Sequence, residues 1–130
     1  MRLLLDTRLL LWWLAGSRRL PRQSRELIRR TEDIFVSAAT AWEIAIKKAL
    51  GRLNAPNDLE AALAASRFQE LPISVRHAVR AGMLPRHHYD LFDRMLVAQA
   101  QVEGLTLLTH DERLEAYGRA VLPCTKLTGA

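Results

Sequence analysis

Five acidic side chains stand where turns of the predicted chain could bring them together. Asp6 directly follows an apolar run, and Glu43 lies one turn into a predicted helix. Asp90 and Asp93 flank the start of another helix, and Asp111 lies two residues past a second apolar run. Taken singly, Asp6, Asp90 and Asp111 suit helix N-caps, where a carboxylate accepts hydrogen bonds from free backbone N–H groups. Glu43 equally suits an ion pair with the lysine four residues further on.

Taken together, several carboxylates in one place have a different chemistry. Like charges within a few ångströms repel, so some carboxylates must take up a proton or share a cation. Oxygen ligands favour Mg²⁺ or Mn²⁺ over zinc, and the one cysteine, Cys124, belongs to no spacing typical of a zinc site. A divalent ion in such a pocket can activate water and stabilise charge on a phosphodiester, while arginines hold the backbone.

Short apolar runs alternate with longer helical patterns, which is typical of βα units around a parallel sheet. Strands are predicted at 3–5, 34–36, 105–109 and 120–122, with 71–73 as a proline-containing edge candidate. Helices are predicted at 7–15, 21–31, 38–50, 59–67 and 92–102, from Ser74 to about Met83, and from near Asp111. The expected fold class is α/β, a three-layer α/β/α sandwich with a short four- or five-stranded parallel sheet. Such sheets bind ligands beyond the carboxyl ends of their strands.

Length and composition limit the possible classes of protein. The 130 residues suit a single domain, 1–130, with 49% hydrophobic and 25% charged residues, a balance that excludes a disordered chain. The net charge is +5 and arginine supplies 16 of 19 basic residues, which favours a nucleic acid or an acidic protein as partner. The unbroken apolar run at 9–15 is too short to span a bilayer, so we expect no membrane segment. A reducing, cytoplasmic location fits the single cysteine.

Four segments, in this order, resemble the PIN-domain ribonucleases, and among them the VapC toxins of type II toxin–antitoxin pairs. They are MRLLLDT at 1–7, SAATAWEIAIKKAL at 37–50, YDLFDRMLVAQA at 89–100 and LTLLTHDERL at 105–114. The resemblance spans nearly the whole chain and has an acid at each expected place. It implies a PIN-like fold for this sequence.

The resemblance also implies roles for individual residues. The residues matched to the catalytic, metal-binding quartet are Asp6, Glu43, Asp93 and Asp111. Asp6 and Asp93 would be the most direct ligands of Mg²⁺, for which Mn²⁺ could substitute. Thr7 and Thr109 match hydroxyl positions that support the pocket. Asp90 matches an additional acid, with helix capping as the equal alternative.

By the same resemblance, the activity would be cleavage of RNA, transfer or ribosomal, by a metal-activated water, which leaves a 5′ phosphate and inhibits translation. The implied partners are the RNA substrate, a VapB-type antitoxin that reaches the acidic pocket, and a second copy in a homodimer. Two positions depart from the family pattern. Arg8 places a cation beside the first acid, and Leu91 replaces a proline, which affects loop stiffness more than chemistry.

Basic and aromatic residues near the acids are further candidates. Those assigned to contacts with RNA phosphates are Arg8, Arg86, Arg94 and Arg113, with solvated surface charges as the alternative. His87 and His88 form a loop pair that could contact phosphate, and His110 is expected at the pocket rim rather than on a metal. The adjacent Trp12 and Trp13 cannot both face the core from one helix, so one should be buried. The other is either available for an interface or packed against a second surface, with equal weight.

Two other functional classes compete with the ribonuclease. A receiver-like phospho-acceptor domain needs adjacent acids after its first strand and a lysine after a late one. Only Asp6 follows the first predicted strand, and the lysines are Lys47, Lys48 and Lys126, so this class is disfavoured. The second is a non-catalytic PIN-fold module that binds RNA or protein; the complete quartet argues against it, but only product formation separates the two.

Overall fold

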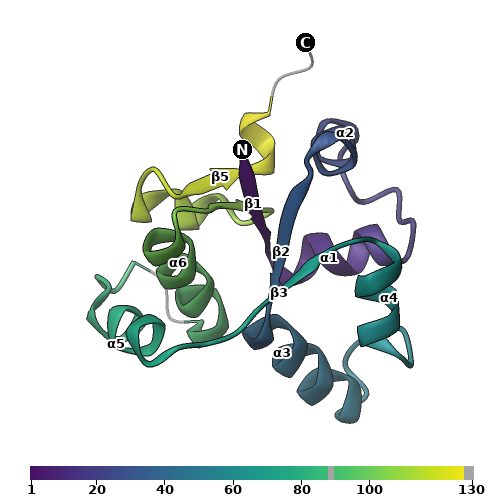
Figure 1. Cartoon of the computed structure of the whole chain (residues 1–130), viewed down its shortest axis with the longest axis horizontal. Helices are drawn as coiled ribbons and strands as arrows, with labels where there is room; N and C mark the ends of the chain where they lie inside the picture. The colour runs from purple at the N-terminus through teal and green to yellow at the C-terminus, as the bar shows by residue number, and fades with distance from the viewer. Residues whose placement is uncertain (88–89, 128–130) are drawn as a thin grey trace.

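The computed structural model describes residues 1–87 and 90–127, and one parallel sheet forms its centre (Figure 1). The strands are β1 (Arg2–Leu5), β2 (Asp33–Ser37), β3 (Gln69–Leu71), β4 (Thr106–Thr109) and β5 (Val121–Pro123), in the order β3-β2-β1-β4-β5. In the central strand, Leu4 pairs with Phe35 of β2 and with Leu107 of β4. The predicted short parallel sheet is confirmed, with five strands.

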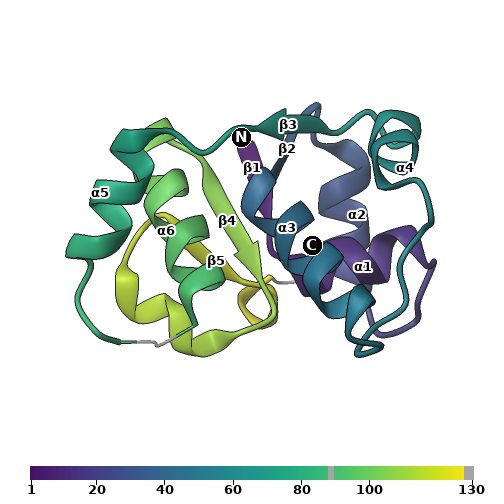
Figure 2. The same ribbon diagram turned by 90° about the horizontal axis from the view of Figure 1, so that it is seen from below.

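Helices cover both faces of this sheet. They are α1 (Thr7–Leu14), α2 (Arg22–Arg30), α3 (Ala38–Ala49), α4 (Leu59–Ala65), α5 (Val75–Met83) and α6 (Leu91–Glu103), with 3₁₀ turns η1 (Glu112–Tyr117) and η2 (Cys124–Lys126). Figures 1 and 2 show α1, α2 and α4 on one side and α5 and α6 on the other. Side chains alternate along β1: Leu3 and Leu5 pack in the cluster that contains Leu9, and Leu4 in the one that contains Leu96. The three-layer sandwich is therefore confirmed.

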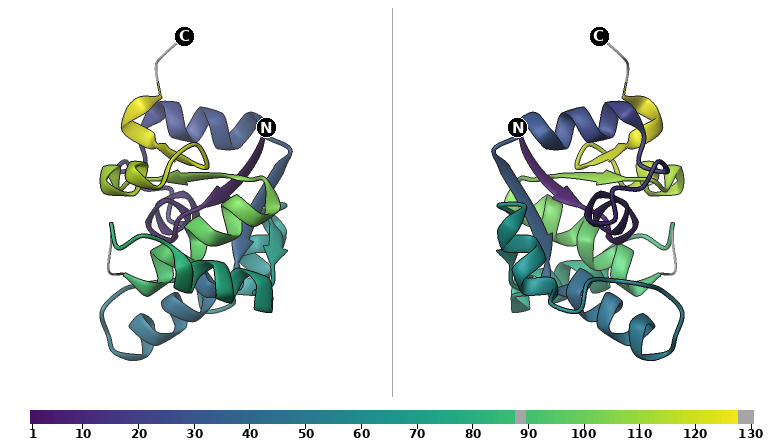
Figure 3. Two further views of the ribbon diagram at one scale, coloured as in Figure 1. Left: turned by 90° about the vertical axis from the view of Figure 1, so that its left-hand side faces the viewer. Right: turned by 90° about the vertical axis from the view of Figure 1, so that its right-hand side faces the viewer.

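The helices that follow the strands begin at short polar side chains. The Ser37 hydroxyl accepts a hydrogen bond from the Ala39 N–H at 2.9 Å and so caps α3 at the end of β2. Ser74 caps α5, as predicted. Gly104 ends α6 with φ 68°, a left-handed conformation that glycine adopts without steric cost. Asp6 caps α1 directly after β1, so that the chain runs from the first strand straight into the first helix (Figure 3).

Three predicted elements differ in detail. The edge strand lies at Gln69–Leu71, two residues earlier than expected, because Pro72 has no N–H for the ladder. The helix after Asp111 is a 3₁₀ turn rather than an α-helix. The last strand is shifted by one residue to Val121–Pro123. Within the described ranges, no helix is both long and apolar enough to cross a membrane.

The tryptophans correct two further expectations. The helical spacing of the apolar residues in 38–50 predicts Trp42 on the inward stripe of its helix, but it is 63% exposed. The inward face of α3 is formed by Ala39, Thr40, Glu43 and Ile44. The stripe is therefore rotated by one residue, which turns Glu43 inward. Trp12 and Trp13 are both half-buried, rather than one buried and one exposed.

Candidate active site

Asp6 begins α1 at the carboxyl end of β1, and its carboxylate joins two elements. Oδ1 accepts a hydrogen bond from the Leu9 N–H at 2.7 Å, which caps the helix. Oδ2 accepts hydrogen bonds from the Thr109 hydroxyl at 2.7 Å and from the His110 N–H at 2.9 Å, both at the end of β4. Only 2% of Asp6 is exposed. Helix capping and a place in a polar site therefore coexist in one side chain, through different oxygens.

Glu43 points inward from α3, with 5% of the residue exposed. Its Oε1 accepts a hydrogen bond from the Thr7 hydroxyl at 2.6 Å, and its Oε2 contacts the Lys47 ammonium at 2.5 Å. The ion pair with Lys47 that the sequence allowed is present, but on a buried face. A buried carboxylate needs a partner charge and hydrogen bonds to offset its desolvation, and Thr7 and Lys47 supply both.

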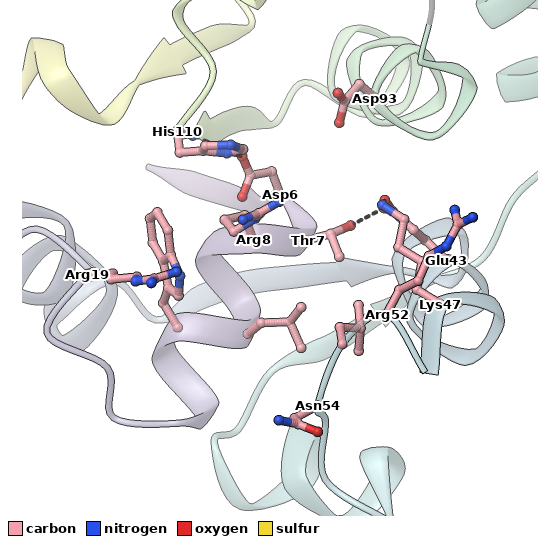
Figure 4. A pocket seen from close by; sticks show the side chains of 13 residues that line it. Asp6, Thr7, Arg8, Arg19, Glu43, Lys47, Arg52, Asn54, Asp93 and His110 are labelled. Carbon is pink, nitrogen blue, oxygen red and sulfur yellow. Dashed lines mark hydrogen bonds and ion pairs between the residues drawn. The ribbon is translucent and has the colours of Figure 1, made fainter. Parts of the chain in front are cut away.

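Asp90 and Asp93 have separate positions at the start of α6. Asp90 is exposed, and its Oδ1 accepts hydrogen bonds from the backbone N–H groups of Phe92 and Asp93 at 2.9 and 3.1 Å. Of its two predicted roles, the structure shows helix capping. Asp93 lies in the first turn, and its carboxylate points toward the space in front of Asp6 (Figure 4).

Asp111 follows β4, where the sequence placed it, but Arg113 engages its carboxylate. The guanidinium donates from Nε to Oδ1 at 3.0 Å and from an Nη atom to Oδ2 at 2.9 Å, a bidentate arrangement of the stronger kind. The hydrogen bond and charge of Asp111 raise the pKa of Arg113. The Asp111 N–H also donates to the Thr109 hydroxyl oxygen at 3.0 Å, which connects this turn to Asp6.

A pocket of about 460 Å³ lies at this edge of the sheet (Figure 4). It brings together three members of the predicted quartet, Asp6, Glu43 and Asp93, whereas Asp111 is not among the residues that line it. Four arginine and lysine side chains also line the pocket: Arg8, Arg19, Lys47 and Arg52. Its apolar wall is formed by Leu11, Trp12 and Leu53. The acids Asp6 and Glu43 are buried and the arginines are exposed, so negative charge lies at the floor and positive charge at the rim.

His110 lies at this rim, as expected, with 40% of its side chain exposed. Its Nδ1 is 2.9 Å from Asp6 Oδ2, and its ring meets Trp12 edge-on at a centroid distance of 5.8 Å. The hydrogen bond to Asp6, with the charge of that carboxylate, raises the pKa of His110, against the lowering effects of burial and of Arg8. The contact with Asp6 therefore favours the protonated imidazole at this position.

The donor set fits a hard divalent cation in its chemistry, because the strong ligands that line the pocket are the carboxylate oxygens of three acids, with the His110 imidazole beside them. The acids are, however, not arranged as a ready metal site. Among the described residues, no three His, Cys, Asp or Glu side chains are close enough to hold an ion together. Basic side chains of the protein contact the acids instead. Lys47 contacts Glu43, His110 contacts Asp6, and Arg113 contacts Asp111.

The four arginines assigned to phosphate contacts have different surroundings. Arg8 lines the pocket and is exposed. Arg86 is exposed but does not line it. Arg94 turns inward, where its guanidinium donates to the carbonyl oxygens of residues 81, 84 and 85 and so ties α6 to the end of α5. Arg113 binds Asp111. Of the histidine pair, His87 meets Tyr117 edge-on at 5.1 Å, and His88 lies outside the described residues.

Sequence reasoning missed two residues of the rim, Arg19 and Arg52. They lie in the connections after α1 and α3, respectively, and reach the pocket from different parts of the chain. Nothing in their immediate sequence separates them from the other surface arginines. Lys47 carried a signal, its i, i+4 spacing from Glu43, but that spacing alone does not show which face of the helix is buried.

Fold and site together define a parallel α/β domain with an acidic pocket at the carboxyl edge of its sheet. The model of the PIN domain family matches residues 3–120. The chain belongs to the PIN domain family, and the resemblance drawn from its four segments is confirmed. No curated protein sequence matches the chain.

Solved structures share this fold. One is of a toxin–antitoxin complex from Klebsiella pneumoniae, with 23% identity, a TM-score of 0.67, and coverage of 92% of this chain and 94% of that one. FitAcB from Neisseria gonorrhoeae has 21% identity, a TM-score of 0.69 and coverage of 96% and 99%. VapBC2 from Rickettsia felis, bound to a DNA fragment from their promoter, has 16% identity, a TM-score of 0.66 and coverage of 95% and 97%.

Proposed function

We propose that the protein is a metal-dependent endoribonuclease and acts as the VapC-type toxin of a type II toxin–antitoxin pair. The observation that carries this proposal is the pocket in which Asp6, Glu43 and Asp93 converge beneath Arg8. Buried carboxylates suit a hard cation, and exposed arginines suit the phosphates of an RNA backbone. Membership of the PIN domain family supports nuclease chemistry.

In this proposal, the metal ion is bound by the carboxylates of Asp6, Glu43, Asp93 and Asp111. The ion is Mg²⁺, for which Mn²⁺ can substitute. When bound, such an ion activates water for attack on a phosphodiester and offsets the charge that develops there. The chain's own hydrogen bonds prepare these ligands: the Thr7 hydroxyl orients Glu43, and the Thr109 hydroxyl orients Asp6. Cleavage with displacement of the 3′ oxygen leaves a 5′ phosphate on one product and a 3′ hydroxyl on the other.

Toxin function adds three partners to the proposal. They are transfer or ribosomal RNA, whose cleavage inhibits translation in the cytoplasm, a VapB-type antitoxin that blocks the pocket, and a second copy of the chain in a homodimer. The similar structures support the antitoxin, since one of them is a toxin–antitoxin complex and others are VapBC proteins bound to DNA. A net charge of +5 is consistent with RNA as substrate.

RNA cleavage by the purified chain tests this function. Total RNA is incubated with the protein in Mg²⁺ or in EDTA, together with Asp93→Asn and, as a matched control, Glu32→Gln on the exposed surface before β2. Discrete fragments with 5′ phosphates should appear in Mg²⁺ with the wild type and with Glu32→Gln. They should be absent in EDTA and with Asp93→Asn. Cleavage that persists in EDTA would contradict the metal requirement.

One observation favours a second candidate, a non-catalytic PIN-fold module that binds RNA or protein. Asp6, Glu43 and Asp111 each contact a basic side chain, and the lysine and the arginine already partly compensate the charge of Glu43 and Asp111 without a metal. Under this alternative the folded, antitoxin-free chain binds RNA in Mg²⁺ but releases no fragments. The cleavage assay above therefore separates the two functions.

A further inference from the structure

Two arginines at the rim of the acidic pocket, Arg19 and Arg52, have no role in the function proposed above. Arg19 lies on one side of the pocket and Arg52 on the other, with Asp6 and Thr7 between them (Figure 4). Both side chains are exposed. Among the described residues neither guanidinium has an ion-pair partner or a hydrogen-bond acceptor, although three acids line the same pocket.

Both arginines lie in connections whose backbone is fixed by hydrogen bonds at the end of the preceding helix. After α3, the Gly51 N–H bonds to the Lys48 carbonyl oxygen at 3.0 Å and the Arg52 N–H to the Lys47 carbonyl oxygen at 2.8 Å, with Gly51 at φ 69°. This is a Schellman motif, which fixes the direction in which a chain leaves its helix. The Lys48 ammonium further ties the connection to the Pro56 carbonyl oxygen at 3.1 Å.

The connection after α1 is built in the same way. Gly16 has φ 60°, its N–H bonds to the Trp13 carbonyl oxygen at 3.1 Å, and the Ser17 N–H bonds to the Trp12 carbonyl oxygen at 2.9 Å. Arg25 of α2 donates to the Ser17 carbonyl oxygen at 2.8 Å. A fixed backbone lowers the ordering cost of a contact made by the side chain that it carries.

The wall of the pocket between these arginines is apolar. Trp12, half-buried, contributes its indole to this wall, beside Leu11 and Leu53. Aromatic side chains in nucleic-acid sites stack on bases, and this requires bases that are not already paired and stacked in a duplex. A cation on each side and an aromatic surface between them match a single nucleic-acid strand that crosses the pocket.

We propose that Arg19 and Arg52 are positioning residues that grip the phosphates on either side of the cleaved one, and that Trp12 receives an unpaired base. These three side chains would together hold an unpaired segment of the RNA strand. This inference rests on the proposed ribonuclease function, because it concerns the same pocket. It adds two contacts from the connections after α1 and α3 to the one expected of Arg8.

Binding of uncleaved RNA tests the grip. A fluorescein-labelled, unstructured 12-nucleotide RNA is titrated by anisotropy in EDTA at several salt concentrations, with a blunt RNA duplex as the second probe. Arg19→Gln/Arg52→Gln is compared with Arg18→Gln/Arg119→Gln, which removes the same charge from exposed positions outside the pocket. The first pair should lower the salt slope for the single strand by about 1.4 and weaken binding about tenfold at 0.15 M salt. The control pair should weaken it by no more than about twofold.

The variant Trp12→Leu tests whether the indole stacks on an unpaired base. Loss of stacking should weaken single-strand binding at least about fivefold and leave duplex binding unchanged. Equal effects of the two double variants, or duplex RNA bound as tightly as the single strand by the wild type, would overturn the inference. Binding of an acidic peptide that depends on Arg19 and Arg52 while RNA binding does not would overturn it as well, in favour of a protein partner.

The same variants separate failure of the inference from failure of the proposed function. If the wild type cleaves RNA in Mg²⁺ and Arg19→Gln/Arg52→Gln has an unchanged KM, the grip is wrong and the nuclease stands. If the wild type never cleaves but binds single strands through these arginines, the grip stands and the function is the non-catalytic one. When both stand, the double variant should raise KM about tenfold with kcat nearly unchanged, which a general loss of folding would not produce.

Discussion

The hydrogen bond between Thr7 and Glu43 should contribute measurably to stability, because both groups are buried and the acceptor carries charge. The Thr7 hydroxyl lies 2.6 Å from Glu43 Oε1 and 3.2 Å from the Thr40 hydroxyl. Thr7→Val keeps the shape of the side chain but removes this donor. A hydrogen bond to a charged group contributes about 1.5–3 kcal/mol, so the variant should lose about 2 kcal/mol of unfolding free energy. For a chain of this size that corresponds to a fall in Tm of about 7 °C.

Urea denaturation of the metal-free protein measures this loss. The cycle of Thr7→Val, Glu43→Met and the double variant isolates the pair, with an expected coupling of about 1–2 kcal/mol. Thr7→Ser is the matched control, since it keeps the hydroxyl and should retain most of the coupling. A coupling near zero, or a loss below about 0.5 kcal/mol for Thr7→Val, would refute the view that Thr7 holds Glu43 in place.

Three further predictions concern the ends of the strands and helices. His110 has its pKa raised by Asp6 in the folded state, so its contribution to stability is full below pH about 6.5 and disappears as pH rises through the folded pKa. His110→Gln should therefore flatten the dependence of metal-free Tm on pH above about 6.5; an unchanged profile would contradict this. Arg113→Gln should tighten Mn²⁺ binding several-fold in electron paramagnetic resonance titrations, because Asp111 loses a competing cation; weaker binding would oppose the argument. Gly104→Ala should cost about 1 kcal/mol in urea denaturation, since φ is 68° there, and a stabilised variant would refute that strain.

Most of the fold could be predicted from local patterns. The apolar run before Asp6, the caps at Ser37 and Ser74, and the glycine that ends α6 each specify a boundary through chemistry within a few residues. The inward turn of Glu43 could not be predicted this way. Apolar residues recur all around α3, so periodicity alone placed Trp42 inside, and only packing against neighbouring elements selects the face.

The candidate site was predictable in its acids and less so in its bases. Three of four acids meet in one pocket because each follows a strand or begins a helix at the same edge of the sheet. The positions of the arginine side chains cannot be predicted from the ends of strands and helices in this way. Arg94 stands next to an acid in sequence yet turns into the protein, whereas Arg19 reaches the pocket from a distant connection. A long side chain is placed by tertiary contacts, which short-range sequence does not contain.

Asp6 both caps a helix and lies in the acidic pocket, and this affects how such a protein can lose its activity by mutation. Its two oxygens hold the start of α1 and the end of β4, so replacing the carboxylate removes charged hydrogen bonds from the core as well as the metal ligand that the proposed function assigns to it. Spontaneous inactivation at Asp6 therefore depletes the folded protein, together with any surface that captures an antitoxin. If Asp93 holds the metal, Asp93→Asn, which keeps the size of this side chain in the first turn of α6, should leave a folded but inert copy. Under the proposed function, that copy still sequesters antitoxin and so frees active copies in the same cell.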